Sequence, residues 1–193
     1  MLILIIGLTL FLGIHSTRIF ADPWRTKFIA QRGDKAWKGV YTLVSLVGFG
    51  LIVWGFGLAR QQPVLLWSPP TGLKHLNALL TWLAFVLLAA TNNNKSQIHG
   101  VIHHPMVLGV KVWALGHLLA NGMVHDVILF GSFLVWSILC FAASRRRDRV
   151  TGIKYAKGSA IGTAINVLIG TVLWAIFAFW LHGWLIGIKA FSI

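Results

Sequence analysis

The stretch that decides the fold runs from His103 to Gly122 and reads HHPMVLGVKVWALGHLLANG. Pro105 suits the first residue of a helix, because its missing N–H would have no helical partner there. His104 then takes the N-cap position, and the closing Asn-Gly pair predicts the C-terminal stop. The helix between these ends is apolar except for Lys111 and His117. Since an ionisable side chain inside lipid is costly and commonly functional, both are candidate site residues.

The rest of the chain is equally apolar. Its 193 residues are 57% hydrophobic and 11% charged, which excludes an ordinary soluble domain. Several apolar runs reach about 20 residues, enough to cross roughly 30 Å of hydrocarbon. The first run lacks a basic start, so it predicts an uncleaved membrane helix. We therefore expect one all-α membrane domain over residues 1–193, with six transmembrane helices: Met1–Phe20, Trp37–Ala59, His75–Thr91, Pro105–Met123, Val127–Ala143 and Ala160–Ile188.

The distribution of basic residues predicts a topology. A net charge of +13 in a soluble protein would favour nucleic acid, but here the basic residues flank apolar spans, so no nucleic-acid partner is expected. By the positive-inside rule, the odd-numbered connections are cytoplasmic and both termini are periplasmic. These connections could also contact anionic lipid headgroups. They hold thirteen of the 17 Lys and Arg residues: Arg18, Arg25, Lys27, Arg32, Lys35, Lys38, Lys95, Arg145, Arg146, Arg147, Arg149, Lys154 and Lys157.

Two of the eight histidines, His15 and His117, fall within the predicted hydrocarbon layer. The other six fall near its surfaces and need no special explanation. A buried imidazole must satisfy both ring nitrogens, and a Ser, an Asn or a backbone carbonyl of a neighbouring helix would suffice. Because the chain has no Glu and only four acidic residues, neutral imidazoles here suit a haem iron better than a hard cation. A zinc site would need a third ligand, which Asp126 beside His125 could supply only at the outer surface.

Two geometric questions remain open for such a haem site. Lys111 either extends its ammonium toward the cytoplasmic surface or pairs with an acidic ligand such as a haem propionate. His15 and His117 differ in depth by roughly 10 Å, which a tilted porphyrin between tilted helices would partly absorb. If this difference in depth is real, His15 and His104 would be the geometrically easier pair of axial ligands.

The helix after Pro105 with His104 and His117, the Ile-His-Ser around His15, and the basic Phe20–Lys38 loop together resemble the NnrU family. These are bacterial membrane proteins associated with nitrite and nitric oxide reduction. The related 15-cis-zeta-carotene isomerases share the His-Pro-x-x-x-Gly start and a later Trp-x-x-x-His. The resemblance places this chain in the bacterial inner membrane.

The resemblance also implies a cofactor. It points to haem b, with His15, His104 and His117 at the matching positions and His15 and His117 as first-choice axial ligands. We add Lys111 and Arg18 as candidate propionate partners. The implied chemistry is redox-gated cis-trans isomerisation of an apolar polyene or lipid. The isomerases carry a thiol one turn before the last histidine, where this chain has Ala114, so ligand switching through a thiolate is not expected.

Two alternatives stay open. Membrane methyltransferases of the isoprenylcysteine type share His-Pro-x-x-x-Gly, but they carry further acidic residues, whereas Ser144–Ser159 holds Asp148 alone. A non-catalytic accessory or assembly factor would instead act through contacts with denitrification membrane proteins. Small residues permit close helix packing within one chain or in a homo-oligomer: Gly48, Gly50, Gly55, Gly57, Gly162 and Gly170.

Overall fold

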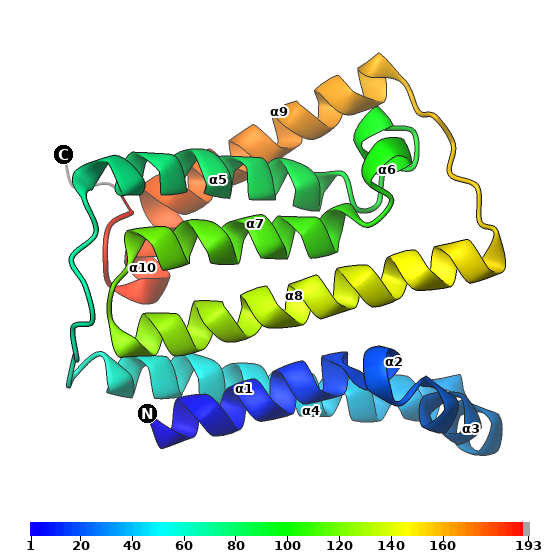
Figure 1. Cartoon of the computed structure of the whole chain (residues 1–193), viewed down its shortest axis with the longest axis horizontal. Coiled ribbons are helices and arrows are strands. Elements are labelled where there is room, and N and C mark those ends of the chain that lie inside the picture. The colour runs from blue at the N-terminus through cyan, green and yellow to red at the C-terminus, as the bar shows by residue number, and fades with distance from the viewer. Residues whose placement is uncertain (191–193) are drawn as a thin grey trace.

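The computed structural model describes residues 1–190, and the predicted all-helical class is confirmed for them (Figure 1). Outside the helices, this part of the chain has two isolated β-bridges, Leu65 with Met123 and Ser96 with Ser159. The helices are α1 (Leu2–His15), α2 (Thr17–Phe20), α3 (Asp22–Arg32), α4 (Asp34–Ala59), α5 (Thr71–Ala89), α6 (Gln97–Ile102), α7 (Pro105–Ala120), α8 (Val124–Thr151), α9 (Ala160–Ile176), the π-helical turn η1 (Phe177–Leu181) and α10 (His182–Ile186).

Each of the six predicted spans contains a helix, but these helices differ in length. Four helical units in residues 1–190 are long and apolar enough to cross a membrane: α4, α5, α8 and the continuous unit from α9 to α10. The other two, α1 and α7, are apolar but have 14 and 16 residues. At about 1.5 Å per residue they fall short of a hydrocarbon layer of roughly 30 Å.

Helix α8 lies at the centre of the bundle (Figure 1). The α1–α4 pair covers one side of it, and α7 covers the other; α5 packs on α7, and α9 packs on α5. One end of the bundle carries α2, α3, α6 and the C-terminal turns of α8. We call it the basic end, because the two lysine- and arginine-rich segments, residues 18–38 and 145–157, meet there. The N-terminus and α10 lie at the opposite end, here called the far end.

Glycines allow α1 and α4 to approach closely. A Cβ at Gly48 would lie 2.7 Å from the backbone N of Phe11, and one at Gly55 would fall on the backbone of Leu4. Leu4 is fully buried in this contact. Such small residues let two helix backbones touch where a larger side chain would separate them.

For four of the six glycines that could allow packing within one chain or in a homo-oligomer, the structure shows packing within the chain. Gly48 and Gly55 face α1, while Gly162 and Gly170 approach the backbones of Lys95 and Val86 within the same chain. Gly50 and Gly57, by contrast, have nothing within 4 Å of a Cβ.

Three local expectations need correction. The Phe20–Lys38 segment is mostly the helix α3, which Pro23 starts in its first turn, and not a loop. The first apolar run is interrupted at Ser16, so α1 ends one turn before Phe20. The glycine after α7 has another role: helix α7 ends at Ala120, and a Cβ at Gly122 would collide with the carbonyl of Trp67. Gly122 therefore permits a close approach of two backbones.

Candidate functional site

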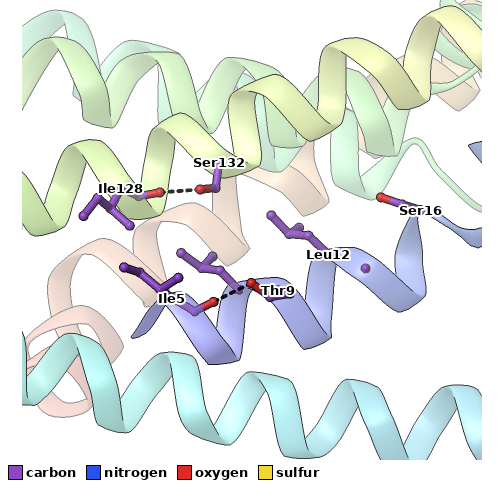
Figure 2. A pocket seen from close by; sticks show the side chains of 8 residues that line it. Ile5, Thr9, Leu12, Ser16, Ile128 and Ser132 are labelled. Atoms are coloured by element: carbon purple, nitrogen blue, oxygen red, sulfur yellow. Dashed lines mark hydrogen bonds between the residues drawn. The ribbon is translucent and has the colours of Figure 1, made fainter. Parts of the chain in front are cut away.

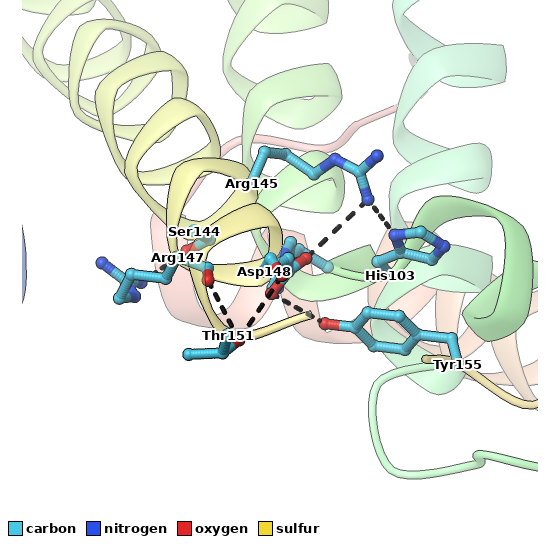
Figure 3. A network of polar contacts seen from close by, with 8 residues as sticks. His103, Ser144, Arg145, Arg147, Asp148, Thr151 and Tyr155 are labelled. Atoms are coloured by element: carbon cyan, nitrogen blue, oxygen red, sulfur yellow. Dashed lines mark hydrogen bonds and ion pairs between the residues drawn. The ribbon is translucent and has the colours of Figure 1, made fainter. Parts of the chain in front are cut away.

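Five side chains from segments far apart in the sequence meet at the basic end, and Figure 3 shows four of them with labels. His103 and His104 precede α7, Arg145 and Asp148 belong to the last turns of α8, and Tyr155 follows α8. We call this group the histidine–aspartate cluster. The antiparallel packing of α7 on α8 brings the start of one helix beside the end of the other.

The carboxylate of Asp148 is the centre of the cluster. His104 Nε2 donates to Asp148 Oδ2 at 2.8 Å, and the Tyr155 hydroxyl donates to Oδ1 at 3.2 Å. The Arg145 guanidinium lies 3.8 Å from Oδ2. The His104 and Asp148 side chains are 21% and 15% exposed, respectively. The pair is thus held in a fixed orientation, yet it stays within reach of water or a ligand.

His103 has a strained backbone. Its φ of 68° is the one positive value of a non-glycine residue in residues 1–190. The His104 N–H donates to the Ile102 carbonyl at 2.9 Å, which closes a γ-turn around His103. Its ring stacks on Tyr155 with centroids 4.0 Å apart, and Arg145 Nη1 contacts Nδ1. Strained residues of this kind concentrate at functional sites.

The cluster is suited to proton exchange. Burial and the neighbouring Asp148 raise the pKa of the Tyr155 phenol, so the hydroxyl stays protonated at neutral pH and remains a donor. Imidazole changes its charge near neutral pH and can take up or release a proton. A carboxylate that holds one ring nitrogen sets which nitrogen carries that proton.

Sequence reasoning overlooked most of this cluster. His103 is expected from the sequence only at the cytoplasmic surface and His104 as an alternative haem ligand, and neither expectation includes their contacts with Tyr155 and Asp148. Asp148 was noted only as a single acid, and Arg145 only as part of a basic connection. The usable signal was the His-His pair before Pro105 together with one acid in a strongly basic stretch.

The two histidines predicted to lie within the membrane carry the ring hydrogen on different nitrogen atoms. His15 Nδ1 donates to the Phe11 carbonyl at 2.6 Å, so a neutral ring keeps its lone pair on Nε2. A hydrogen bond from the other nitrogen is typical of histidines that bind metals. At His117, Asn121 Nδ2 donates to Nδ1 at 3.4 Å, which places the ring hydrogen on Nε2.

His15 and His117 are each packed against aromatic rings. His15 stacks on Phe11 and His117 stacks on Phe130, with centroids 4.2 and 4.5 Å apart. The Phe133 ring lies 5.9 Å from Phe11 and 5.5 Å from Trp113, which contacts His117 in turn. A series of aromatic contacts thus connects the two imidazole rings.

The remaining predicted site residues lie apart from this pair. The Lys111 ammonium lies 5.8 Å from the Phe141 ring, which also contacts His104. The Arg18 carbonyl accepts a hydrogen bond from Arg147 at 3.2 Å. Within residues 1–190, no three His, Cys, Asp or Glu side chains gather as metal ligands would.

His125 lies at the start of α8, at the far end, and is buried within the protein there. It is 5% exposed, and its Nδ1 is buried without a hydrogen-bond partner. Its Nε2 lies 3.7 Å from Asp126 Oδ1, and its ring contacts Phe56 edge-on. No sequence pattern indicates this burial, because it depends on the packing of α4 against the start of α8.

Comparison with known proteins identifies the family. The sequence matches the family described as NnrU protein over residues 3–190, nearly the whole chain. No curated protein and no solved structure matches it. The resemblance carried by the His103–Gly122 stretch is thereby confirmed: this chain, with its apolar helices of membrane-spanning length, belongs to the NnrU family.

Proposed function

We propose that this chain is a multi-pass protein of the bacterial inner membrane that supports nitrite and nitric oxide reduction through proton exchange at its histidine–aspartate cluster. The observation that carries the proposal is the strained γ-turn at His103, beside the His104–Asp148 pair. The link to nitrogen oxides rests on membership of the NnrU family.

The proposed topology has six spans, with the basic end in the cytoplasm and both termini in the periplasm. It is supported by the meeting of the basic segments at one end and the position of the N-terminus and α10 at the other (Figure 1). The shorter helices α1 and α7 would cross where the bilayer thins locally.

Labelling with a membrane-impermeant maleimide tests this topology. Cys140 is first replaced by Ser, and single cysteines are then introduced at exposed Lys157 and exposed Gln62. In intact spheroplasts we expect label at position 62 and not at position 157. The reverse pattern would overturn the proposed orientation.

The proposed role is tested in a denitrifying strain that lacks the gene. His104→Asn and Asp148→Asn should each slow nitrite and nitric oxide consumption at least fivefold at unchanged protein level. His75→Asn and Asp34→Asn, two exposed positions outside the cluster, serve as matched controls. Full complementation by Asp148→Asn would refute a role for the cluster.

Haem b binding is a second candidate function, supported by the state of His15. Its Nε2 carries the lone pair that an iron ligand requires, because Nδ1 donates to the Phe11 carbonyl. We therefore propose His15 rather than His117 as the principal ligand. Polyene isomerisation and the accessory role are both compatible with such a haem.

Absorption spectra of the purified protein test the haem proposal. We expect a Soret band that is lost in His15→Ala and retained in His75→Ala. Loss of the Soret band in His117→Ala as well would favour His15 and His117 together as the axial ligands. The aromatic rings packed around these two histidines would then have to rearrange. Bound S-adenosylmethionine without a Soret band would favour the methyltransferase alternative. Feeding poly-cis carotenoids to expressing cells would separate an isomerase from an accessory factor.

A further inference from the structure

A cavity of about 290 Å³ lies between α1 and α8 (Figure 2). We call it the α1–α8 groove. It is lined on α1 by Ile5, Leu12, Gly13 and Ser16, and on α8 by Ile128 and Ser132. From Ile5 to Ser16 it extends roughly 16 Å along α1, at about 1.5 Å per residue. This length equals about half of a 30 Å hydrocarbon layer, which is the depth of one leaflet.

The walls of the groove behave as an apolar surface. Thr9 Oγ1, which also lines it, donates to the Ile5 carbonyl at 2.8 Å, and Ser132 Oγ donates to the Ile128 carbonyl at 2.6 Å. Both hydroxyl hydrogens are therefore used within their own helices. Apart from Gly13 and from Ser16 at the basic end, the remaining lining is aliphatic, which suits a hydrocarbon chain.

The basic end of the groove carries two guanidinium groups. Arg18 follows Ser16 by two residues, and its carbonyl accepts from Arg147 Nη1 at 3.2 Å. Arg147 Nη2 donates to Ser144 Oγ at 2.8 Å, which holds this guanidinium beside α2. A cationic pair thus lies where a groove of one-leaflet depth reaches its polar end.

We propose that the α1–α8 groove binds an anionic phospholipid, with one acyl chain in the groove and the phosphate between Arg18 and Arg147. Guanidinium groups form strong charge-assisted hydrogen bonds with phosphate, and their charge selects anionic over zwitterionic headgroups. The bound lipid joins α1 and α2 to α8. The inference goes beyond the proposed function and is independent of the histidine–aspartate cluster.

Filling the groove tests the acyl-chain part. A Cβ at Gly13 would meet nothing within 4 Å, so Gly13→Leu adds a side chain at the groove without a clash. Gly50→Leu is the matched control, because Gly50 is also an exposed helical glycine with open space around it, on α4. Delipidated full-length protein in detergent is titrated with phosphatidylglycerol or phosphatidylcholine, and its melting temperature is measured.

For the native chain and Gly50→Leu, we expect phosphatidylglycerol to raise the melting temperature at a concentration at least fivefold lower than phosphatidylcholine. Gly13→Leu should lose this preference. Equal stabilisation by the two lipids, or an unchanged response of Gly13→Leu, would overturn the proposal.

The headgroup part is tested with Arg18→Gln, compared with Arg149→Gln on the exposed side of α8. Arg18→Gln should weaken binding of phosphatidylglycerol at least fivefold, while Arg149→Gln should change it little. Glycerol phosphate and haem are titrated in the same assay. Stabilisation by glycerol phosphate alone would indicate a phosphate site without a chain, and tighter binding of haem would assign Arg18 to a propionate; either result would refute the lipid site.

Discussion

The two faces of α1 are packed in opposite ways. Toward α4, Gly7, Gly48 and Gly55 allow direct contact between helix backbones. Toward α8, the same helix leaves the α1–α8 groove. Both faces are apolar, so hydrophobicity alone does not explain the difference. The placement of glycine does: a contact without gaps forms where α4 offers no side chain at the crossing, and a groove remains where α8 offers Ile128 and Ser132.

The largest effect is expected from Gly55→Leu. Its side chain would collide with the backbone of Leu4 and force α1 away from α4. Overpacking typically costs about 1–3 kcal/mol, and a collision with a helix backbone lies at the upper end of this range. In detergent, the melting temperature should fall by roughly 6–12 °C, or the protein should fail to accumulate. Gly57→Leu, two residues later and in open space, is the control; equal loss in both variants would contradict the argument.

Leu8→Ala should have the next largest effect, because Leu8 contributes to both faces. It is 5% exposed, belongs to the core with Leu4 and Ile52, and also lines the groove. We expect a loss of about 2 kcal/mol, at the lower end for a buried leucine, because lipid is as apolar as the protein interior. Reversible unfolding in mixed micelles measures it. A loss below the error of the method would mean that α1 is not packed tightly on either side.

Arg147→Gln tests the one hydrogen bond described between α2 and α8. The substitution removes the bond to the Arg18 carbonyl and the bond to Ser144. Each is worth about 1 kcal/mol, and partial exposure reduces this. We expect faster hydrogen exchange in α2 and an unchanged rate in α4. Arg149→Gln should change neither rate.

The smallest effect, and one of opposite sign, is expected from Gly13→Ala. A methyl group at this position meets open space, and alanine favours a helix over glycine by about 0.5–1 kcal/mol. The melting temperature should therefore rise slightly. A fall would show that α8 lies closer to Gly13 than the groove allows.

These positions also show how much could be read from the sequence. The helices were predictable because their apolar runs are long, and Pro105 marks the start of α7 where the structure has it. The contact of His104 with Asp148 was not predictable from the sequence, because 44 residues separate them and the pairing depends on α7 lying antiparallel to α8. The same holds for His125, whose burial depends on Phe56 of another helix.

The length of the helices was predicted less well than their presence. Apolar composition does not distinguish a helix that ends in a turn from one that continues into polar residues. Helix α8 therefore extends to Thr151 through four arginines, where the prediction ended at Ala143. In the same way, Ser16 ends α1 within an apolar run, before Phe20.

The π-helical turn Phe177–Leu181 divides the last helical unit into two registers. Such a turn holds one residue more than an α-helix of the same rise, so deleting one residue there would leave a regular helix. Because the extra residue is absorbed within the turn, the residues after the deletion would keep the faces that they now present. The same deletion in the regular part of α9 would instead rotate everything after it by about 100° around the axis. The π-helical turn is therefore the place in this helix where the chain can lose one residue and keep the surface of α10, with His182, at the far end.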